Sequence, residues 1–228
     1  MSPTFKHFIG ISIVKIVSKL LAAAAAFSLA GSAQAANLIV NGNFDSPDVG
    51  GGSGTFNSIP GWVSNTGDTI EIGNSGVYGL GCVTAGCHNL EVNANTFGDV
   101  SQTVSGLTAG NSYFLSLIYG GRGGGGFQQL WVSFGGQTIG IFGSDGSASA
   151  WTYYATFEVA ATSASEVLDF YSANVGGNPS YGNEVTGVSL TSSAPVSSAP
   201  EPATWAMMLI GLGGIGGAVR SRRKAVTA

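Results

Sequence analysis

The chain has 228 residues and a formal net charge of −4, but its charges are unevenly distributed. Three of the eight basic residues precede Leu20 and four follow Val219, so Arg122 is the only cation between Ala36 and Ala199, against 11 acids. A segment with this acidic excess repels nucleic acid, whose binding depends on Lys and Arg. The composition therefore excludes nucleic acid as a partner.

The first 35 residues have the pattern of a secretory signal peptide. Three lysines precede the apolar run 20–31, and residues 32–35 read Ser-Ala-Gln-Ala, which supplies small residues in an A-x-A arrangement. Cleavage is expected after Ala35, and the Sec machinery is the expected export partner. The protein is therefore expected to leave the cytoplasm.

Residues 36–191 are predicted to form one all-β domain. Short apolar runs recur between clusters of Gly, Asn, Ser and Asp, and no helical period continues beyond two turns. The predicted strands are 38–40, 61–63, 69–72, 89–93, 99–104, 112–119, 130–134, 137–142, 151–159, 167–172 and 184–191. Short strands joined by Gly-rich turns predict a two-sheet antiparallel β-sandwich of the jelly-roll kind.

Two of these segments have informative patterns. Residues 113–119 are apolar on both faces apart from Ser116, which predicts a central strand. Residues 151–159 alternate between apolar or aromatic odd positions and mostly polar even positions, which predicts a strand half-buried on the core. Trp62 and Trp151 are expected in that core.

Cys82 and Cys87 enclose four residues. Thiols of exported proteins are oxidised, which favours a disulfide that closes a short loop. The alternative makes these two cysteines and His88 metal ligands, but three ligands fall short of a tetrahedral site.

Residues 120–126 read Gly-Gly-Arg-Gly-Gly-Gly-Gly, but they lack the Gly-Lys-Ser/Thr ending of a phosphate loop and are predicted to be a loop between strands. Arg122 within it either forms a salt bridge across the loop mouth or donates to sugar hydroxyls. Trp131, Tyr154 and Tyr171 lie out of phase with the apolar residues of their strands, so their rings are expected to be exposed and suited to stacking on sugars.

Enzyme chemistry has little support in the domain. It has no Lys and its only histidine is His88, so mechanisms based on a Ser-His-Asp triad or a Schiff base would depend on one residue beside the cysteines. A carboxylate pair for glycoside hydrolysis stays open among the 11 acids. We expect a non-enzymatic protein. A structural matrix protein without a specific ligand and a glycoside hydrolase are the two alternatives to a binding module.

The C-terminal segment begins with a Ser- and Ala-rich linker at 192–199. Pro200, Glu201 and Pro202 follow, and then the uncharged apolar run 203–219. About 17 residues rise ~25 Å as a helix against a hydrocarbon core of roughly 30 Å, which predicts a marginal transmembrane helix. The basic residues after it, expected on the cytoplasmic side, are Arg220, Arg222, Arg223 and Lys224. A helix packed under a soluble domain is the alternative, but it leaves this basic cluster unexplained.

This order of motif, apolar helix and basic end resembles the PEP-CTERM sorting signal of Gram-negative bacteria that make exopolysaccharide. The resemblance covers residues 199–228, with the sorting signal proper at 200–228. It implies recognition by an exosortase, cleavage near 200–202, and transient anchoring in the inner membrane. The upstream domain would then be released or transferred to the cell surface.

A series of short motifs in the domain resembles, in order, the galactose-binding-like jelly-roll domains. The motifs lie at 37–45, 59–62, 70–72, 89–93, 100–104, 113–116 and 188–190. The resemblance implies a carbohydrate-binding or cell-wall-associated module, with exopolysaccharide as the expected ligand. Relatives often hold a structural Ca²⁺, which would fall to Asp45 and Glu184 here, because Thr186 stands where the family has its acid. Calcium is the only cofactor that the resemblance implies.

Overall fold

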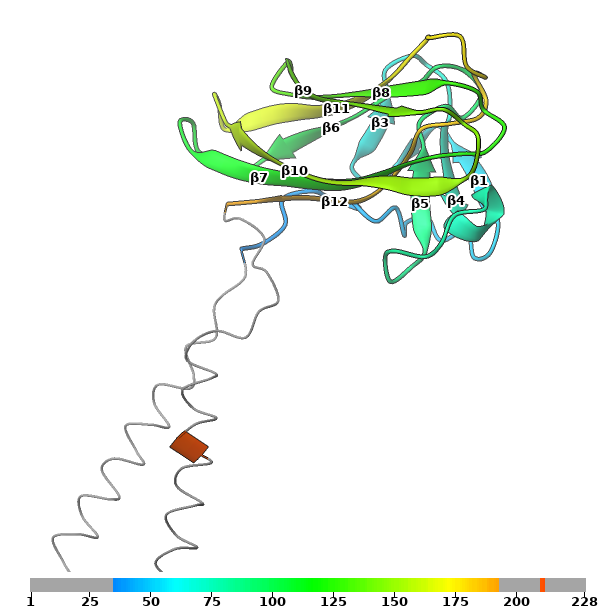
Figure 1. Cartoon of the computed structure of the whole chain (residues 1–228). Coiled ribbons are helices and arrows are strands. Elements are labelled where there is room, and N and C mark those ends of the chain that lie inside the picture. The colour runs from blue at the N-terminus through cyan, green and yellow to red at the C-terminus, as the bar shows by residue number, and fades with distance from the viewer. Residues whose placement is uncertain (1–34, 193–209, 212–228) are drawn as a thin grey trace, which may run out of the picture.

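The computed structural model describes residues 35–192 and 210–211, and residues 53–191 form an antiparallel β-sandwich of the jelly-roll kind (Figure 1). The predicted signal peptide, most of the linker and nearly all of the sorting signal lie outside the described residues. Among the helices within the described ranges, none is long and apolar enough to cross a bilayer.

Two six-stranded sheets face each other across one core. Sheet A has the strand order β1-β4-β5-β12-β7-β10 and sheet B the order β2-β3-β6-β11-β8-β9. The strands of sheet A are β1 (Ser53–Phe56), β4 (Ile70–Asn74), β5 (His88–Glu91), β12 (Glu184–Thr191), β7 (Ser112–Gly121) and β10 (Ala150–Ala160). Those of sheet B are β2 (Ser58–Ile59), β3 (Trp62–Ser64), β6 (Asp99–Ser105), β11 (Ser165–Ala173), β8 (Gln128–Phe134) and β9 (Gln137–Ser144). A 3-10 turn, η2 (Ser75–Tyr78), follows β4.

Ten of the eleven predicted strands are confirmed, with boundaries that shift by a few residues. The segment 112–119 is an inner strand, β7, which pairs with β12 on one side and β10 on the other. It continues through Gly120 and Gly121, so the Gly-rich loop is shorter than expected. The strands β1 and β2 were not predicted, because their short Ser- and Gly-containing sequences lack an apolar alternation.

The predicted strand 38–40 is wrong. The backbone N–H of Leu38 donates to Leu190 O, but Val40 pairs with a side chain: its N–H donates to Oε1 of Gln102, and its carbonyl accepts from Nε2 of Gln102. The indole of Trp62 also donates to Val40 O at 3.1 Å. The backbone of this segment is therefore satisfied largely by side chains, so no strand ladder forms.

Trp62 lies in the core at 1% exposure, as predicted, but Trp151 does not. The register between β10 and β7 shifts between Trp151 and Tyr153, and this irregularity breaks the alternation on which the prediction depended. The indole of Trp151 is only partly buried and donates to Gly81 O at 2.7 Å.

Candidate functional site

An exposed row of large side chains crosses the outer face of sheet B. Tyr171 on β11 lies directly opposite Trp131 on β8, which lies directly opposite Ile141 on β9. Their exposed fractions are 42%, 40% and 53%. Their strand neighbours Leu130 and Phe170 are fully buried, so the row faces away from the core. We call these two aromatic residues and one aliphatic residue, Tyr171, Trp131 and Ile141, the aromatic row.

A polar cluster adjoins one end of the aromatic row. Asp99 on β6 lies directly opposite Tyr171, and Asp169 shares the outward face of β11 with Tyr171. Nδ2 of Asn65 donates to Oδ1 of Asp99 at 2.7 Å and to Oδ1 of Asp169 at 3.4 Å. Ser101 Oγ donates to the amide oxygen of Asn65 at 3.2 Å. The fold therefore places carboxylate and amide groups beside exposed rings.

Asp169 has a raised pKa. Burial, a hydrogen bond to Asp99 and the negative charge of Asp99 together raise the pKa of Asp169 to about 7, and burial contributes most. A protonated carboxyl group can both donate and accept hydrogen bonds. Such a group suits hydroxyl groups, which do the same.

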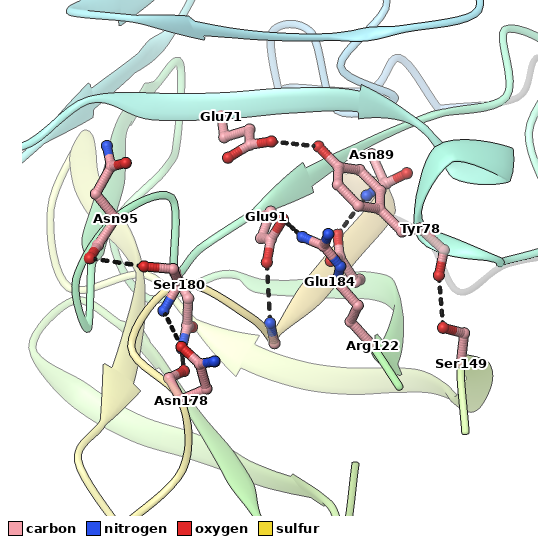
Figure 2. A network of polar contacts seen from close by, with 12 residues as sticks. Glu71, Tyr78, Asn89, Glu91, Asn95, Arg122, Ser149, Asn178, Ser180 and Glu184 are labelled. Carbon is pink, nitrogen blue, oxygen red and sulfur yellow. Dashed lines mark hydrogen bonds and ion pairs between the residues drawn. The ribbon is translucent and has the colours of Figure 1, made fainter. Parts of the chain in front are cut away.

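A second polar cluster lies on the outer face of sheet A. Glu71, Glu91 and Glu184 lie directly opposite one another across β4, β5 and β12. Figure 2 shows their partners: Tyr78 Oη donates to Glu71 at 2.8 Å, and Nδ2 of Asn89 donates to Oε2 of Glu184. Glu91 and Glu184 are fully buried, and Oε1 of Glu184 is a buried atom without a hydrogen-bond partner. We call Glu71, Glu91 and Glu184 the glutamate row.

Arg122 is the cation of the glutamate row. Its Nη1 donates to Oε2 of Glu91 at 2.9 Å, and Oε1 of Glu91 accepts from the backbone N–H of Gly182 at 2.9 Å (Figure 2). The guanidinium carbon lies 4.8 Å from the ring centroid of Tyr78 and 4.1 Å from that of Tyr181. Arg122 thus forms the salt bridge that the sequence left as one of two alternatives, and the rings of Tyr78 and Tyr181 both lie close to its guanidinium.

The 3-10 turn η2 positions Tyr78 over this cluster. Asn74 caps the turn by accepting from the N–H of Gly76, and Gly79 ends it in the left-handed conformation. The ring of Tyr78 lies over Gly73, where an added Cβ would be 2.1 Å from a ring carbon. Glycine at position 73 of β4 therefore leaves the space that the Tyr78 ring occupies.

Burial dominates the protonation of the glutamate row. The pKa of Glu91 is raised to about 7, because the effect of burial outweighs that of the positive charge of Arg122, which lowers the pKa. Glu184 has its pKa well above the ordinary value, because of burial and then the charge of Glu91. Tyr78 hydrogen-bonds Glu71, and Arg122 connects Glu91 to the Gly-rich loop. The glutamate row is thus a buried polar network rather than an open site.

The predicted calcium ligands do not share a site. Oδ1 of Asp45 accepts from Nδ1 of His88 at 3.0 Å, whereas Oε2 of Glu184 accepts from Nδ2 of Asn89. Successive side chains of a strand point to opposite faces, so these contacts lie on opposite sides of β5. Within residues 35–192 and 210–211, no group of three or more His, Cys, Asp or Glu side chains could hold a metal ion. Asp45 and Glu184 therefore do not contribute to one shared set of the six to eight oxygen ligands that Ca²⁺ takes.

Cys82 and Cys87 form the predicted disulfide, which removes both thiolates from any metal site.

Of the four predicted ligand-binding residues, the fold brings together Trp131 and Tyr171. Tyr154 is 68% exposed but lies on β10 of the other sheet, and Arg122 belongs to the glutamate row. The sequence alone did not point to Asn65, Asp99 and Asp169. The two-residue spacing between Asp169 and Tyr171 could have placed both on one face, whereas the pairing with Asp99 depends on register.

Comparison with known proteins identifies the C-terminal segment. The model of the PEP-CTERM protein-sorting motif matches residues 198–224, which confirms the resemblance described above. The motif indicates export and exosortase-dependent sorting to the surface of a Gram-negative bacterium. No curated protein matches the chain.

Solved structures similar to the chain include carbohydrate-binding modules. CBM35 from Paenibacillus barcinonensis is 18% identical, with a TM-score of 0.39, and the match covers 63% of this chain and 100% of that one. TmCBM61 in complex with β-1,4-galactotriose is 11% identical, with a TM-score of 0.38 and coverage of 69% and 99%. A family 35 carbohydrate-binding module from Clostridium thermocellum is 14% identical, with a TM-score of 0.32 and coverage of 62% and 92%. Each is a similarity of fold.

Proposed function

We propose that this protein is an exported, exosortase-processed surface or matrix protein whose sandwich binds neutral polysaccharide through the aromatic row. One observation carries the proposal: Trp131 lies directly opposite Tyr171 on an exposed sheet face, next to the Asp99, Asp169 and Asn65 cluster. Exopolysaccharide is the proposed source of the ligand, because the sorting motif directs the chain to the cell surface.

The aromatic rings and the polar oxygens match the apolar face and the hydroxyl groups of a pyranose ring. Aromatic faces bury the apolar C–H face of a sugar ring, and carboxylate or amide oxygens accept from its hydroxyls. The aromatic row crosses three adjacent strands, which at ~4.8 Å between strands spans about 10 Å. This length exceeds one pyranose ring, so the row suits a chain of sugars.

The charge of the domain favours a neutral ligand. Between Ala36 and Ala199 there are 11 acids and one cation, and that cation is already paired with Glu91. A polymer of uronic acids would be repelled by this surface, whereas a neutral polysaccharide carries no such cost. Neutral glycans are therefore the proposed class.

We further propose that residues 36–191 are the binding unit, that 192–199 is a linker and that 203–219 anchors the chain in the inner membrane only until processing.

We also propose that the protein is not an enzyme. Asp99 and Asp169 are within hydrogen-bonding reach of each other. Glycoside hydrolysis instead needs two carboxyl groups about 5 Å apart or more. The carboxyls of Glu91 and Glu184 are fully buried.

Affinity electrophoresis against neutral and acidic polysaccharides tests the proposal. Trp131→Ala and Tyr171→Ala are each expected to weaken binding of a neutral polysaccharide roughly tenfold, which equals about 1.4 kcal/mol. Binding of a short neutral oligosaccharide by Tyr154→Ala is the matched control and should equal that of the wild type, because the substitution removes an exposed aromatic ring from the other sheet. EDTA is expected to leave retardation unchanged. No retardation by any polysaccharide, or equal retardation of the Trp131→Ala variant, would favour a purely structural matrix protein.

A further inference from the structure

The outer edge of sheet A is unusually long and open. β10 has 11 residues and ends the strand order of its sheet, and in the part of the chain that the structure describes β7 is its only paired strand (Figure 1). One side of β10 therefore presents a series of free backbone N–H and C=O groups. Such an edge is a ready template for another strand.

β10 lacks most of the features that protect edge strands. Between Ala150 and Ala160 there is no Pro or Lys, and Glu158 is the only charged residue. The register irregularity affects only the start of the strand, before Tyr153. Tyr153 and Tyr154 are 44% and 68% exposed. The strand thus combines high β-propensity with little charge on an open edge.

We propose that two copies of this chain associate through β10, which pairs antiparallel with β10 of the second copy around Thr156. Two identical strands related by a two-fold axis perpendicular to the sheet present the same faces to each other. This geometry requires the paired residue numbers to differ by an even number. Pairing centred on Thr156 uses the regular stretch 153–159 in full.

Side-chain chemistry favours this register. It places Tyr153 opposite Val159 and Ala155 opposite Phe157 on the inner face, so apolar side chains meet apolar ones. On the outer face it places Tyr154 opposite Glu158, where the phenol can donate to the carboxylate. Centring on Glu158 would instead bring two carboxylates together, and centring on Ala155 would extend into the irregular start of the strand.

The dimer would join the two copies of sheet A into one sheet and place both copies of sheet B on the same side. The two aromatic rows would then face in one direction. For a polysaccharide with repeated sites, two rows on one rigid body raise the apparent affinity through effective concentration. This last consequence rests on the proposed function, whereas the pairing itself does not.

Opposite charges at Thr156 test the pairing directly. Thr156 is exposed and hydrogen-bonds Ser116 through its hydroxyl at 2.9 Å, so a long side chain there is compatible with the fold. In sedimentation of the full chain in mild detergent, the wild type is expected to be dimeric, and Thr156→Lys and Thr156→Glu monomeric, because like charges would meet at the two-fold axis. An equimolar mixture of the two variants is expected to restore the dimer.

Thr138→Lys is the matched control, because Thr138 is exposed on β9, the edge strand of sheet B. It is expected to stay dimeric. A second readout is disulfide cross-linking on the cell surface: Thr156→Cys should give a dimer on a non-reducing gel and Thr138→Cys should not. A monomeric wild type, a dimeric Thr156→Lys variant, or failure of the mixture to associate would overturn the proposal.

Sugar binding separates this proposal from the proposed function. Thr156→Lys is expected to bind a short neutral oligosaccharide as the wild type does, but to show weaker retardation by the polysaccharide. If the dimer forms and no sugar binds, the proposed function fails and the association stands. If the wild type is monomeric and still binds sugar, the association fails and the proposed function stands.

Discussion

Arg122 and Glu91 form a mostly buried ion pair that joins the Gly-rich loop after β7 to the outer face of β5. Nη1 of Arg122 donates to Oε2 of Glu91 at 2.9 Å, and the side-chain exposures are 23% and 0%. The same carboxylate accepts from Gly182, so one buried residue fixes two loops. Removal of either partner would leave a polar group without compensation.

Replacement of the single cation of the domain should be costly. Arg122→Met is expected to lower the free energy of unfolding by about 3–5 kcal/mol, because it leaves Glu91 buried and unpaired. Arg122→Lys keeps the charge but not the planar group that contacts Tyr78 and Tyr181, so an intermediate loss is expected. Urea denaturation of the three proteins at pH 8 measures the order. Equal stability of wild type and Arg122→Met would contradict a structural role for the pair.

Stability should fall as the pH rises through neutrality. Glu91 and Asp169 each have a pKa raised to about 7 from ordinary values of 4.5 and 3.8. The folded state therefore binds more protons than the unfolded state between about pH 4 and pH 7, and this contribution is fully present below the ordinary pKa values and lost above pH 7. Urea midpoints at pH 5 and pH 8 measure the effect.

The Asp169→Asn variant isolates part of this pH dependence. Its amide cannot titrate, so the difference between the midpoints at pH 5 and pH 8 is expected to shrink while the remainder, from the glutamate row, persists. Glu158→Gln is the control, since its carboxyl belongs to neither cluster. A wild type that gains stability between pH 5 and pH 8 would show that the buried carboxyls do not hold their protons.

Processing of the C terminus is the third expectation. In a host with an exosortase, mature protein at the surface is expected to lack residues 205–228, which mass spectrometry would show. Replacement of Arg220, Arg222, Arg223 and Lys224 by Gln should impair retention at the membrane before processing, because the positive end no longer holds its side of the bilayer. Recovery of the protein from the surface with an intact C terminus would refute this sorting route.

The sequence by itself determined the features that depend on local pattern. The sorting motif, the disulfide between Cys82 and Cys87 and ten of the strands follow from residue order, oxidation state and short-range alternation. Exposure of Trp131 and Tyr171 followed in the same way, because a period of two assigns a residue to one face or the other of its strand.

Only the tertiary structure decided which faces come together. Tyr154 has the same local phase signal as Tyr171, yet it lies on the other sheet, while Asp99 comes to lie beside Tyr171 across 72 positions of sequence. The same limit applies to Trp151, which one register irregularity moves out of the core. It also applies to Asp45 and Glu184, which β5 separates. Sheet order and register are set by long-range pairing of backbone and core, and alternation along one strand holds no information about the neighbouring strand.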